Sequence, residues 1–556
     1  MARGAACQRT VRKRTLSASG EDRVPVSPVD AGDGGTYEVN AAEVSFFSWN
    51  VLQVVLIHCV AGALFGYNIG FVGPYYTFYR MSRDCTVITR EDVCPSFYPG
   101  QCTWSGGACK FITNDCADKP IDICVGGSSQ SDGKACYWNV TSGSCEMVIG
   151  FTAVQSGVFA AMLIVGGCIG SLLAPPLLSA TGHRWTFLLC GIIAAAGAAL
   201  THIATSSEQY VILIGGRLLV GVAAGVLCVS SPVYVDETVP IQHRQLVSVF
   251  FQIACTFGIL AAATTGFIMS LSDFSTQEDM QRRRQLLCLP GTIIALLVVV
   301  VGCFMRESAI WLERRRIARA KQEDMLLPPH QRSETVLSES SVAYVHGKVQ
   351  WSAVIHPLCN AFVLCVAQQF TGMNAIMNYA PIIASRMGLS PLFGNFIVMW
   401  GNFVTVLASI PVSYKVRADY AYIIAVLMAS LSCILVGVVV LPFFDFVGTV
   451  RRNLSILGIA LFIMFFELGM GSFFWNLACG IFPPNFRHQG SSFTVLLQFI
   501  FNIFINVGFP IAVELLSGGP SGNQDEGMGI IFLFFGFIGL VCSLYLQGNL
   551  RLWESA

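Results

Sequence analysis

Charged residues are scarce in this chain and neither sign is in excess. They make up 12% of the 556 residues, and 33 basic residues are matched by 33 acidic ones. Soluble domains carry about twice that share of charge, so too few polar side chains remain here to cover several water-exposed globules. This excludes an ordinary soluble enzyme. Without a basic excess the chain also lacks the electrostatic footprint of a protein that binds nucleic acid.

Motifs of enzyme chemistry are equally absent from the sequence. We find no nucleophile–base pair, no metal-ligand cluster and no glycine loop of the kind that cradles phosphates. The sequence therefore predicts no catalytic residue, no metal site and no cofactor.

Long apolar runs are what the sequence has instead. Apolar residues make up 54% of the chain. A helix of about 20 such residues spans the bilayer core. Twelve runs of this length predict an all-α membrane protein with twelve transmembrane helices. The runs lie near residues 50–79, 149–178, 185–205, 209–234, 246–270, 286–304, 353–384, 392–414, 420–441, 454–480, 491–516 and 527–547.

Polar segments divide these runs into two sets of six. A linker at 305–352 separates an N-terminal six-helix bundle, 49–304, from a C-terminal one, 353–547. The polar stretch before the first run is predicted to be a disordered cytoplasmic tail, because a cleaved signal would need an apolar core near its start. The remaining segments are that tail at 1–48, an insert at 80–148 and a short cytoplasmic tail at 548–556.

The insert is rich in cysteine. An even number of cysteines in a short, weakly hydrophobic segment predicts a small disulfide-bonded domain in an oxidising compartment. A zinc cluster is the alternative, which the lack of Cys-x-x-Cys pairs disfavours. The sequon Asn139-Val140-Thr141 predicts glycosylation of Asn139. The eight cysteines are Cys85, Cys94, Cys102, Cys109, Cys116, Cys124, Cys136 and Cys145.

Basic residues indicate which side of the membrane each segment faces. They gather in the N-terminal tail and in the linker, which the positive-inside rule places in the cytoplasm. Arg282–Arg284 and Arg451–Arg452 would then lie outside, against the rule. Disulfides and glycosylation require the insert to face the opposite compartment, which supports the same orientation. We expect a multi-pass plasma-membrane protein with both termini in the cytoplasm.

The two halves repeat short patterns at corresponding places. Gly66-Tyr67-Asn68 in the first run corresponds to Gly372-Met373-Asn374 in the seventh, and each is followed by a proline. The fourth and tenth runs both end in a proline shortly before an arginine, Arg244 and Arg487. A parallel duplication of six spans is an arrangement in which substrate binds at mid-membrane between the halves and access alternates.

Four motifs resemble the signatures of the sugar porter family of the major facilitator superfamily, in the family's order. The resemblance covers residues 50 to about 547 and implies the major facilitator fold, two pseudo-symmetric six-helix bundles. The insert and the segment Arg306–Leu312 look most like the hexose transporters of kinetoplastid protozoa. The four motifs are Gly216-Arg217-Leu218-Leu219-Val220-Gly221, Pro232-Val233-Tyr234 with Glu237, Pro240 and Arg244, Gln368-Gln369-Phe370-Thr371-Gly372-Met373-Asn374, and Glu467-Leu468-Gly469 with Trp475.

The resemblance also implies a sugar site lined by amide side chains. A hexose is neutral, and each of its hydroxyls both donates and accepts hydrogen bonds, as an amide does. The alternatives are that the amides join helices to one another and that Trp475 is an interfacial aromatic residue. The residues that match the family's sugar contacts are Gln252, Gln368, Gln369, Asn374, Asn402, Glu467, Trp475, Gln498 and Asn502.

Charged residues at or near the ends of the runs are predicted to form ion pairs that hold one access state. The alternative is that water simply solvates them. A few kcal/mol of pairing between the halves is enough to bias a two-state equilibrium. These residues are Arg184, Arg217, Glu237, Arg244, Glu307 and Arg487.

Asn68 indicates passive transport. Proton-coupled members of the family that the chain resembles carry Asp at this place in the first span, and Asn cannot change its charge. We therefore expect a facilitative hexose transporter, for glucose and also fructose, that works by alternating access. Its expected partners are a small neutral sugar and the lipid bilayer. A proton-coupled sugar or polyol symporter and a non-transporting sugar sensor are the alternatives.

Overall fold

The computed structural model describes most of the chain between residues 46 and 553, within one compact unit, Phe46–Ala556. The predicted N-terminal tail lies almost wholly outside the described residues. These are residues 46, 48–88, 90–97, 102–111, 136–139, 144–147, 150–151, 153–272, 277–326, 351–374, 390–441, 448–517 and 524–553.

In these described ranges, 11 helices are long and apolar enough to cross a membrane. One of them, α5 (Ala153–Ser207), has 55 residues, more than two crossings need, and departs from helical geometry at Gly182, where φ is 82°. Because α5 holds both the second and the third predicted span, the structure confirms the all-α fold with twelve crossings.

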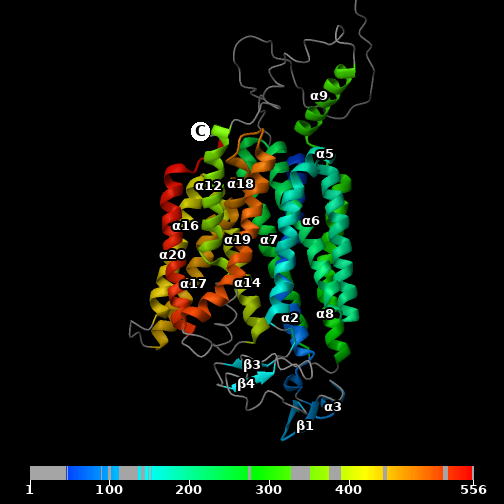
Figure 1. Cartoon of the computed structure of the whole chain (residues 1–556), viewed down its shortest axis with the longest axis vertical. Helices are drawn as coiled ribbons and strands as arrows, with labels where there is room; N and C mark the ends of the chain where they lie inside the picture. The colour runs from blue at the N-terminus through cyan, green and yellow to red at the C-terminus, as the bar shows by residue number, and fades with distance from the viewer. Residues whose placement is uncertain are drawn as a thin grey trace, which may run out of the picture. The chain divides into compact units, whose positions relative to one another are not determined.

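The helices fall into the two predicted sets of six crossings (Figure 1). The first set is α1 (Trp49–Gly70) continued by α2 (Val72–Met81), α5, α6 (Tyr210–Thr238), α7 (Ile241–Ser270) and α8 (Gln277–Phe304). The second set is α12 (Trp351–Phe370), α14 (Pro391–Leu407) continued by α15 (Ser409–Lys415), α16 (Ala418–Val440), α17 (Gly448–Phe465) continued by η3 (Phe466–Gly471) and α18 (Ser472–Gly480), α19 (Arg487–Leu516) and α20 (Gln524–Asn549).

The helices pack first within each half and then across the halves. In the first half α5 packs on α6 and α8, and α1 packs on α7. In the second half α16 packs on α17 and α20, and α12 packs on α19. The halves meet where α19 lies against α5 and where α14 and α18 lie against α7. The surface between them is therefore built from few helices.

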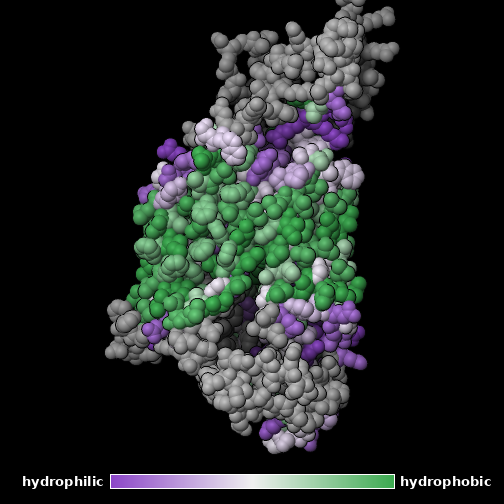
Figure 2. All heavy atoms as spheres, in the orientation of Figure 1, coloured by the Kyte–Doolittle hydropathy of each residue, from purple (hydrophilic) through white to green (hydrophobic). Residues whose placement is uncertain are grey.

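The bundle has two ends, which we call the insert side and the linker side. The insert side is the end from which the segment 80–148 leaves α2, and the linker side is the end from which α8 runs into the linker (Figure 1). Between the two ends a belt of apolar side chains faces outward, bounded by polar residues above and below (Figure 2). Leu544, for example, is 72% exposed. Such a belt matches the hydrocarbon layer of a bilayer.

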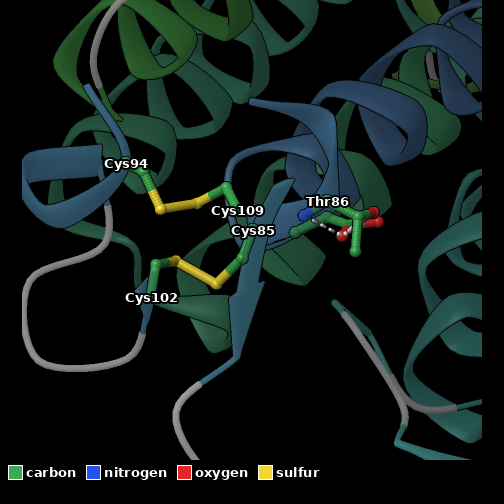
Figure 3. Close-up of a disulfide and its surroundings, with 6 residues drawn as sticks. Cys85, Thr86, Cys94, Cys102 and Cys109 are labelled. Atoms are coloured by element: carbon green, nitrogen blue, oxygen red, sulfur yellow. Dashed lines mark hydrogen bonds between the residues drawn. A yellow bond between two sulfur atoms is a disulfide. The ribbon is translucent and has the colours of Figure 1, made fainter. Parts of the chain in front are cut away.

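The described part of the insert is a small disulfide-bonded structure. It contains a 3-10 turn, a short α-helix and two antiparallel hairpins. Its sulfur atoms form the bonds Cys85–Cys102 and Cys94–Cys109 (Figure 3). Cys145 is also disulfide-bonded. For these cysteines the disulfide prediction is confirmed and the zinc alternative is wrong. The elements are η1 (Cys85–Val87), α3 (Cys94–Phe97), β1 (Cys102–Ser105), β2 (Ala108–Phe111), β3 (Cys136–Asn139) and β4 (Ser144–Met147).

Other predictions about the insert stay untested. Cys116 and Cys124 lie outside the described residues, and so does most of the sequon. Asn139 is the last residue of β3, opposite Ser144 in the hairpin. Its glycosylation remains a prediction.

Three of the five arginines that conflicted with the positive-inside rule have local acceptors on the insert side. Arg284 is 1% exposed and its Nη2 lies 3.0 Å from a carboxylate oxygen of Glu208. Arg283 pairs with Asp279 at 3.0 Å. Arg451 Nε donates to the carbonyl of Val439 at 3.1 Å. These side chains are bound within the bundle rather than free in a loop, so they weigh little against the predicted orientation.

The linker begins with a helix that the sequence did not predict. This helix, α9 (Ala309–Leu326), follows four non-helical residues after α8. Trp311 on its first turn is 6% exposed and lies beneath the guanidinium of Arg315, 5.0 Å from the ring centre. The N-terminal turn of α9 is thereby anchored by apolar packing at the linker side.

Candidate functional site

A cavity of about 600 Å³ lies between the two halves of the bundle. Volumes of this order are typical of small-molecule sites. Its walls extend from the middle of the helices to Gly73, Asn395 and Asn506 near the insert side. The nine side chains that were matched to sugar contacts all line it. They are Gln252, Gln368, Gln369, Asn374, Asn402, Glu467, Trp475, Gln498 and Asn502.

Gln252 connects the two walls of the cavity. It lies on α7, in the first half, and its Nε2 donates to Oε2 of Glu467 in the second half at 3.1 Å. Its Oε1 accepts a hydrogen bond from Nε1 of Trp475 at 3.3 Å. The three side chains therefore form one polar group that reaches across the interface, with the Trp475 ring packed on Phe251, 4.4 Å between ring centres.

Local backbone geometry brings Glu467 to this place. It lies in η3, a single turn of π-helix inserted between α17 and α18, and it is 1% exposed. π-helical turns of this kind often occur at functional sites. Asn402 on α14 lies on the same cavity wall. A carboxylate buried in the membrane needs hydrogen-bond partners such as Gln252, because its desolvation is costly.

The end of α12 presents three further amides to the cavity. Gly372 has φ of 91°, which ends the helix, and an added Cβ there would clash with the ring of Phe535. The turn at Gly372 lets Nδ2 of Asn374 donate to Oε1 of Gln369 at 2.8 Å. One turn earlier, Oε1 of Gln368 accepts from the hydroxyl of Tyr422 at 3.2 Å. This motif therefore makes an ordered wall of amides.

Two amide oxygens beside the cavity have no hydrogen-bond partner among the described residues. They are Oδ1 of Asn402 and Oε1 of Gln498, both buried. Asn502 accepts from Nδ2 of the neighbouring Asn506 at 2.8 Å. A buried acceptor without a partner costs free energy, about 1–3 kcal/mol. A hydroxylated ligand in the cavity would supply the missing donors.

The prediction of an ion pair at a helix end is wrong for Arg217. This residue lies about two turns from the insert-side start of α6 and is 1% exposed. Its Nη1 donates to the backbone carbonyl of Asn68 at 2.7 Å, and its guanidinium lies 5.2 Å from the ring centre of Phe159. A carbonyl and an aromatic ring take the place of a carboxylate, and Nη2 of Arg217 is buried without a hydrogen-bond partner among the described residues. Asn68 itself donates to the carbonyl of Leu64 at 2.8 Å.

The linker side of the bundle is closed by an acidic residue shared between two arginines. Oδ1 of Asp236 lies 3.3 Å from Nη1 of Arg244, in the same half. Its Oδ2 pairs with Nη1 of Arg487, which begins α19 in the other half. Arg487 is 8% exposed. This pair holds α6 and α19 together at the linker side.

A second cluster closes the same end. Glu237 Oε2 lies 3.1 Å from Nε2 of His183 and 2.6 Å from the hydroxyl of Ser308. Its Oε1 lies 3.0 Å from Nε2 of His488, again from the other half. Arg314 on α9 lies 3.7 Å away. Glu237 therefore joins four segments of the chain.

Glu307 and Arg184 contribute to this end through the backbone. Glu307 accepts from the backbone N–H groups of His183 at 2.8 Å and Arg184 at 3.2 Å, where α5 resumes after its break. An acidic group is favourable at such a helix start. The side chain of Arg184 donates to the carbonyl of Cys303 at 2.9 Å. The prediction of an ion pair is therefore wrong for Arg184 as well, because a carbonyl lies within its reach.

Several residues of this closure and of the cavity were missing from the sequence prediction. Asp236, His183 and His488 have central places in it, and Asn395 and Asn506 add amides to the cavity wall. Asp236 directly precedes Glu237 in a motif that resembles the family signature, which was a usable signal. The sequence around His488 gives no such signal, since its partner Glu237 lies 251 residues away in the chain.

These features define a class: a multi-pass membrane protein of two helical halves with a polar cavity between them. The chain belongs to the sugar transporter family, since the family model described as "Sugar (and other) transporter" matches residues 54–547. Accordingly it is not an enzyme.

Individual relatives agree with this assignment. The chain is 34% identical over 527 residues to "Glucose transporter 2A" of Trypanosoma brucei brucei, covering 94% of this chain and 92% of that one. It is 30% identical to "Membrane transporter D2" of Leishmania donovani, covering 91% and 90%. A solved structure of the proton:xylose symporter XylE has the same fold, with a TM-score of 0.64, 17% identity and coverage of 91% and 97%.

Proposed function

We propose that this protein is a facilitative hexose transporter, for glucose and also fructose, that works by alternating access in the plasma membrane. Both termini face the cytoplasm in this proposal, so the insert side faces outward. The single observation that carries the proposal is the cavity between the halves, in which nine amide, acidic and aromatic side chains come together. Relatives named as glucose transporters, at 34% identity, support a hexose as the substrate.

The chemistry of the wall suits a neutral sugar. A hexose that leaves water must exchange each hydroxyl's hydrogen bonds for new ones, because unpaired polar groups are costly to bury. Oδ1 of Asn402 and Oε1 of Gln498 accept from hydroxyls, and the amide N–H groups donate to them. The ring of Trp475 provides an apolar surface for the C–H face of the sugar.

The contacts that join the halves support alternating access. Asp236–Arg487 and Glu237–His488 link them at the linker side, while the cavity extends toward the insert side. Opening the linker side requires both links to break. Sugar bound between the walls supplies the differential binding energy that shifts this equilibrium.

The proposal also states that transport is passive, without coupling to protons. Nη1 of Arg217 donates to the carbonyl of Asn68, and the guanidinium lies beside aromatic rings, while its Nη2 is buried without a hydrogen-bond partner. Among the described residues no carboxylate that could bind and release a proton pairs with it. Asn68 keeps the same charge at any pH. Transport through this site therefore needs no proton to move with the sugar.

A proton-coupled symporter is the second candidate, and Glu467 favours it. This carboxyl group is buried at the cavity wall and hydrogen-bonded to Gln252, so its protonation could be linked to sugar binding. An inward proton gradient across proteoliposomes separates the candidates. The facilitative transporter brings internal glucose only to the external concentration, whereas accumulation above it, lost in Glu467→Gln, would establish the symporter.

Substitution of one wall amide tests the site itself. Gln368→Ala removes two hydrogen-bonding groups from the cavity, and we expect glucose binding to weaken about tenfold or more. Calorimetry on the purified protein and labelled glucose uptake measure this. Gln53→Ala is the matched control, because Gln53 donates to the carbonyl of Phe304 at the linker side, away from the cavity. Equal loss in both variants would contradict the proposal.

A further inference from the structure

His183, Glu237 and His488 bring three metal-binding groups together at the linker side. Their ligand atoms, two imidazole Nε2 and the carboxylate oxygens, all lie within 4.8 Å of one another. The two histidines approach opposite oxygens of the one carboxylate, at 3.1 Å and 3.0 Å. Their rings stand nearly perpendicular, 6.3 Å between centres. Such convergence of side chains from three distant segments is more specific than a cluster of surface acids.

We propose that His183, Glu237 and His488 form a binding site for a divalent transition-metal ion, Zn²⁺ above all, that bridges the two halves of the protein. Two imidazoles and one carboxylate are a donor set that Zn²⁺ uses in proteins, with a fourth position left for water. Hard ions such as Mg²⁺ and Ca²⁺ prefer oxygen ligands only. The chemistry of the donors therefore selects a borderline metal.

The distances suit this ion after small side-chain adjustments. With Zn–N bonds of about 2.0–2.1 Å and Zn–O bonds of about 2.0–2.2 Å, a nitrogen and an oxygen ligand of one ion lie at most about 4.3 Å apart. The two His–Glu separations are already shorter than this limit. The ion would replace the hydrogen bonds between these groups and draw the three ligands around itself.

Arg314 competes with a metal ion for the carboxylate of Glu237. Arg314 on α9 lies 3.7 Å from Glu237 and repels a cation, whereas the hydroxyl of Ser308, 2.6 Å from the same carboxylate, adds an oxygen beside the site. The side chains of His183, Glu237 and His488 are 1%, 6% and 12% exposed. His488 is thus the ligand that solvent reaches most easily.

A bridging ion would act on the gate, that is, on the contacts Asp236–Arg487 and Glu237–His488 that join the halves at the linker side. His183 and Glu237 belong to the first half and His488 to the second, so all three ligands meet only while the linker side is closed. The ion would therefore stabilise the closed state and slow sugar exchange. This part of the inference rests on the proposed function, while the binding of metal does not.

Calorimetric titration of the purified full chain with ZnCl₂ tests the site. We expect His488→Gln to weaken one Zn²⁺ site by about tenfold or more, because it removes one of three ligands but can still donate to Glu237. His356→Gln, an exposed histidine on α12 at the same side, should leave that site intact. Equal Zn²⁺ binding by the wild type and His488→Gln would overturn the proposal.

Two further measurements separate metal binding from its effect on transport. The absorption spectrum of the wild type with Co²⁺ should show the intense bands of a four-coordinate ion, and weak octahedral bands alone would overturn the site. In proteoliposomes, Zn²⁺ on the linker side should slow glucose exchange by the wild type but not by His488→Gln. Binding without slowing would overturn the gating role, whereas absence of glucose exchange in metal-free protein would overturn the proposed function instead.

Discussion

α7 touches the second half at both of its ends, and the two contacts differ in kind. At the linker end the side chain of Gln245 donates to the carbonyls of Ser413 at 2.9 Å and Val416 at 2.6 Å, and accepts from the N–H of Ala418 at 3.1 Å. At the insert end the ring of Phe267 lies 5.1 Å from the rings of both Phe393 and Phe396.

This difference indicates which contact breaks during transport. A hydrogen bond or ion pair has one good geometry, and water can replace it when it opens, so its net contribution is small, about 0.5–1.5 kcal/mol for a hydrogen bond. Aromatic contacts tolerate sliding and lose free energy when water reaches them. The linker end is therefore suited to open and close, and the insert end to rotate in contact.

The largest effect is expected from Asp236→Asn. This change removes the charge that holds Arg244 and Arg487, and leaves Arg487 buried without its acid. Breaking a buried ion pair costs about 3–5 kcal/mol. The linker side should then stay open, so glucose uptake from the insert side should fall by more than tenfold.

The exposed pair Arg90–Asp92 provides the control for this variant. Its side chains are 62% and 65% exposed, so Asp92→Asn should leave uptake unchanged. Uptake by Asp236→Asn at the wild-type rate would show that the gate does not depend on this residue.

An intermediate effect is expected from Gln245→Ala. Its three hydrogen bonds to the second half are lost, and backbone groups near Val416 remain for water to satisfy. Two or three such bonds amount to about 1–3 kcal/mol. We expect a several-fold change in the rate of glucose exchange with little change in the temperature of unfolding. A fall in stability without a change in the rate of glucose exchange would show that Gln245 stabilises the fold and does not control the opening of the linker side.

A smaller effect is expected from Phe267→Leu at the insert end. Leucine retains an apolar contact with Phe393 and Phe396 and loses only the ring–ring term, about 0.5–1.5 kcal/mol. Glucose exchange should change less than the several-fold change expected for Gln245→Ala. The reverse order of the two variants would contradict the comparison of the two ends.

The smallest effect on transport is expected from Cys85→Ser with Cys102→Ser. This disulfide closes a segment with a sequence separation of 17, and its loss should destabilise the insert by about 3 kcal/mol. Cys85 belongs to a buried cluster that includes Met280 and Leu392, and it does not line the cavity. Proteolysis should therefore cut the insert faster while the affinity for glucose is kept.

The sequence predicted the helices better than their interruptions. Runs of about 20 apolar residues are dictated by bilayer thickness, so all twelve crossings were found. The break of α5 at Gly182 and the π-helical turn at Glu467 depend on neighbours such as Glu307 and Gln252 instead. Disulfide pairing was not predictable either, because eight cysteines allow 105 connectivities.

The cavity and the gate differ in the same way. Gln368, Gln369 and Asn374 lie in a motif that resembles a family signature, and the other cavity amides were matched to family positions one by one. All of them line the cavity. The contacts of Asp236 with Arg487 and of Glu237 with His488 join residues that are both 251 positions apart. Only the packing of α19 against α6 makes them neighbours, and the misassigned Arg217 shows that charge near a predicted helix end is a weak guide.

Counterflow tests the central claim most directly. Proteoliposomes filled with unlabelled glucose are diluted into a trace of labelled glucose without any proton gradient. If one cavity is exposed to the two sides in turn, labelled glucose enters faster than into empty vesicles and passes transiently above its external concentration. Equal entry into loaded and empty vesicles, with no overshoot, would contradict alternating access through this cavity.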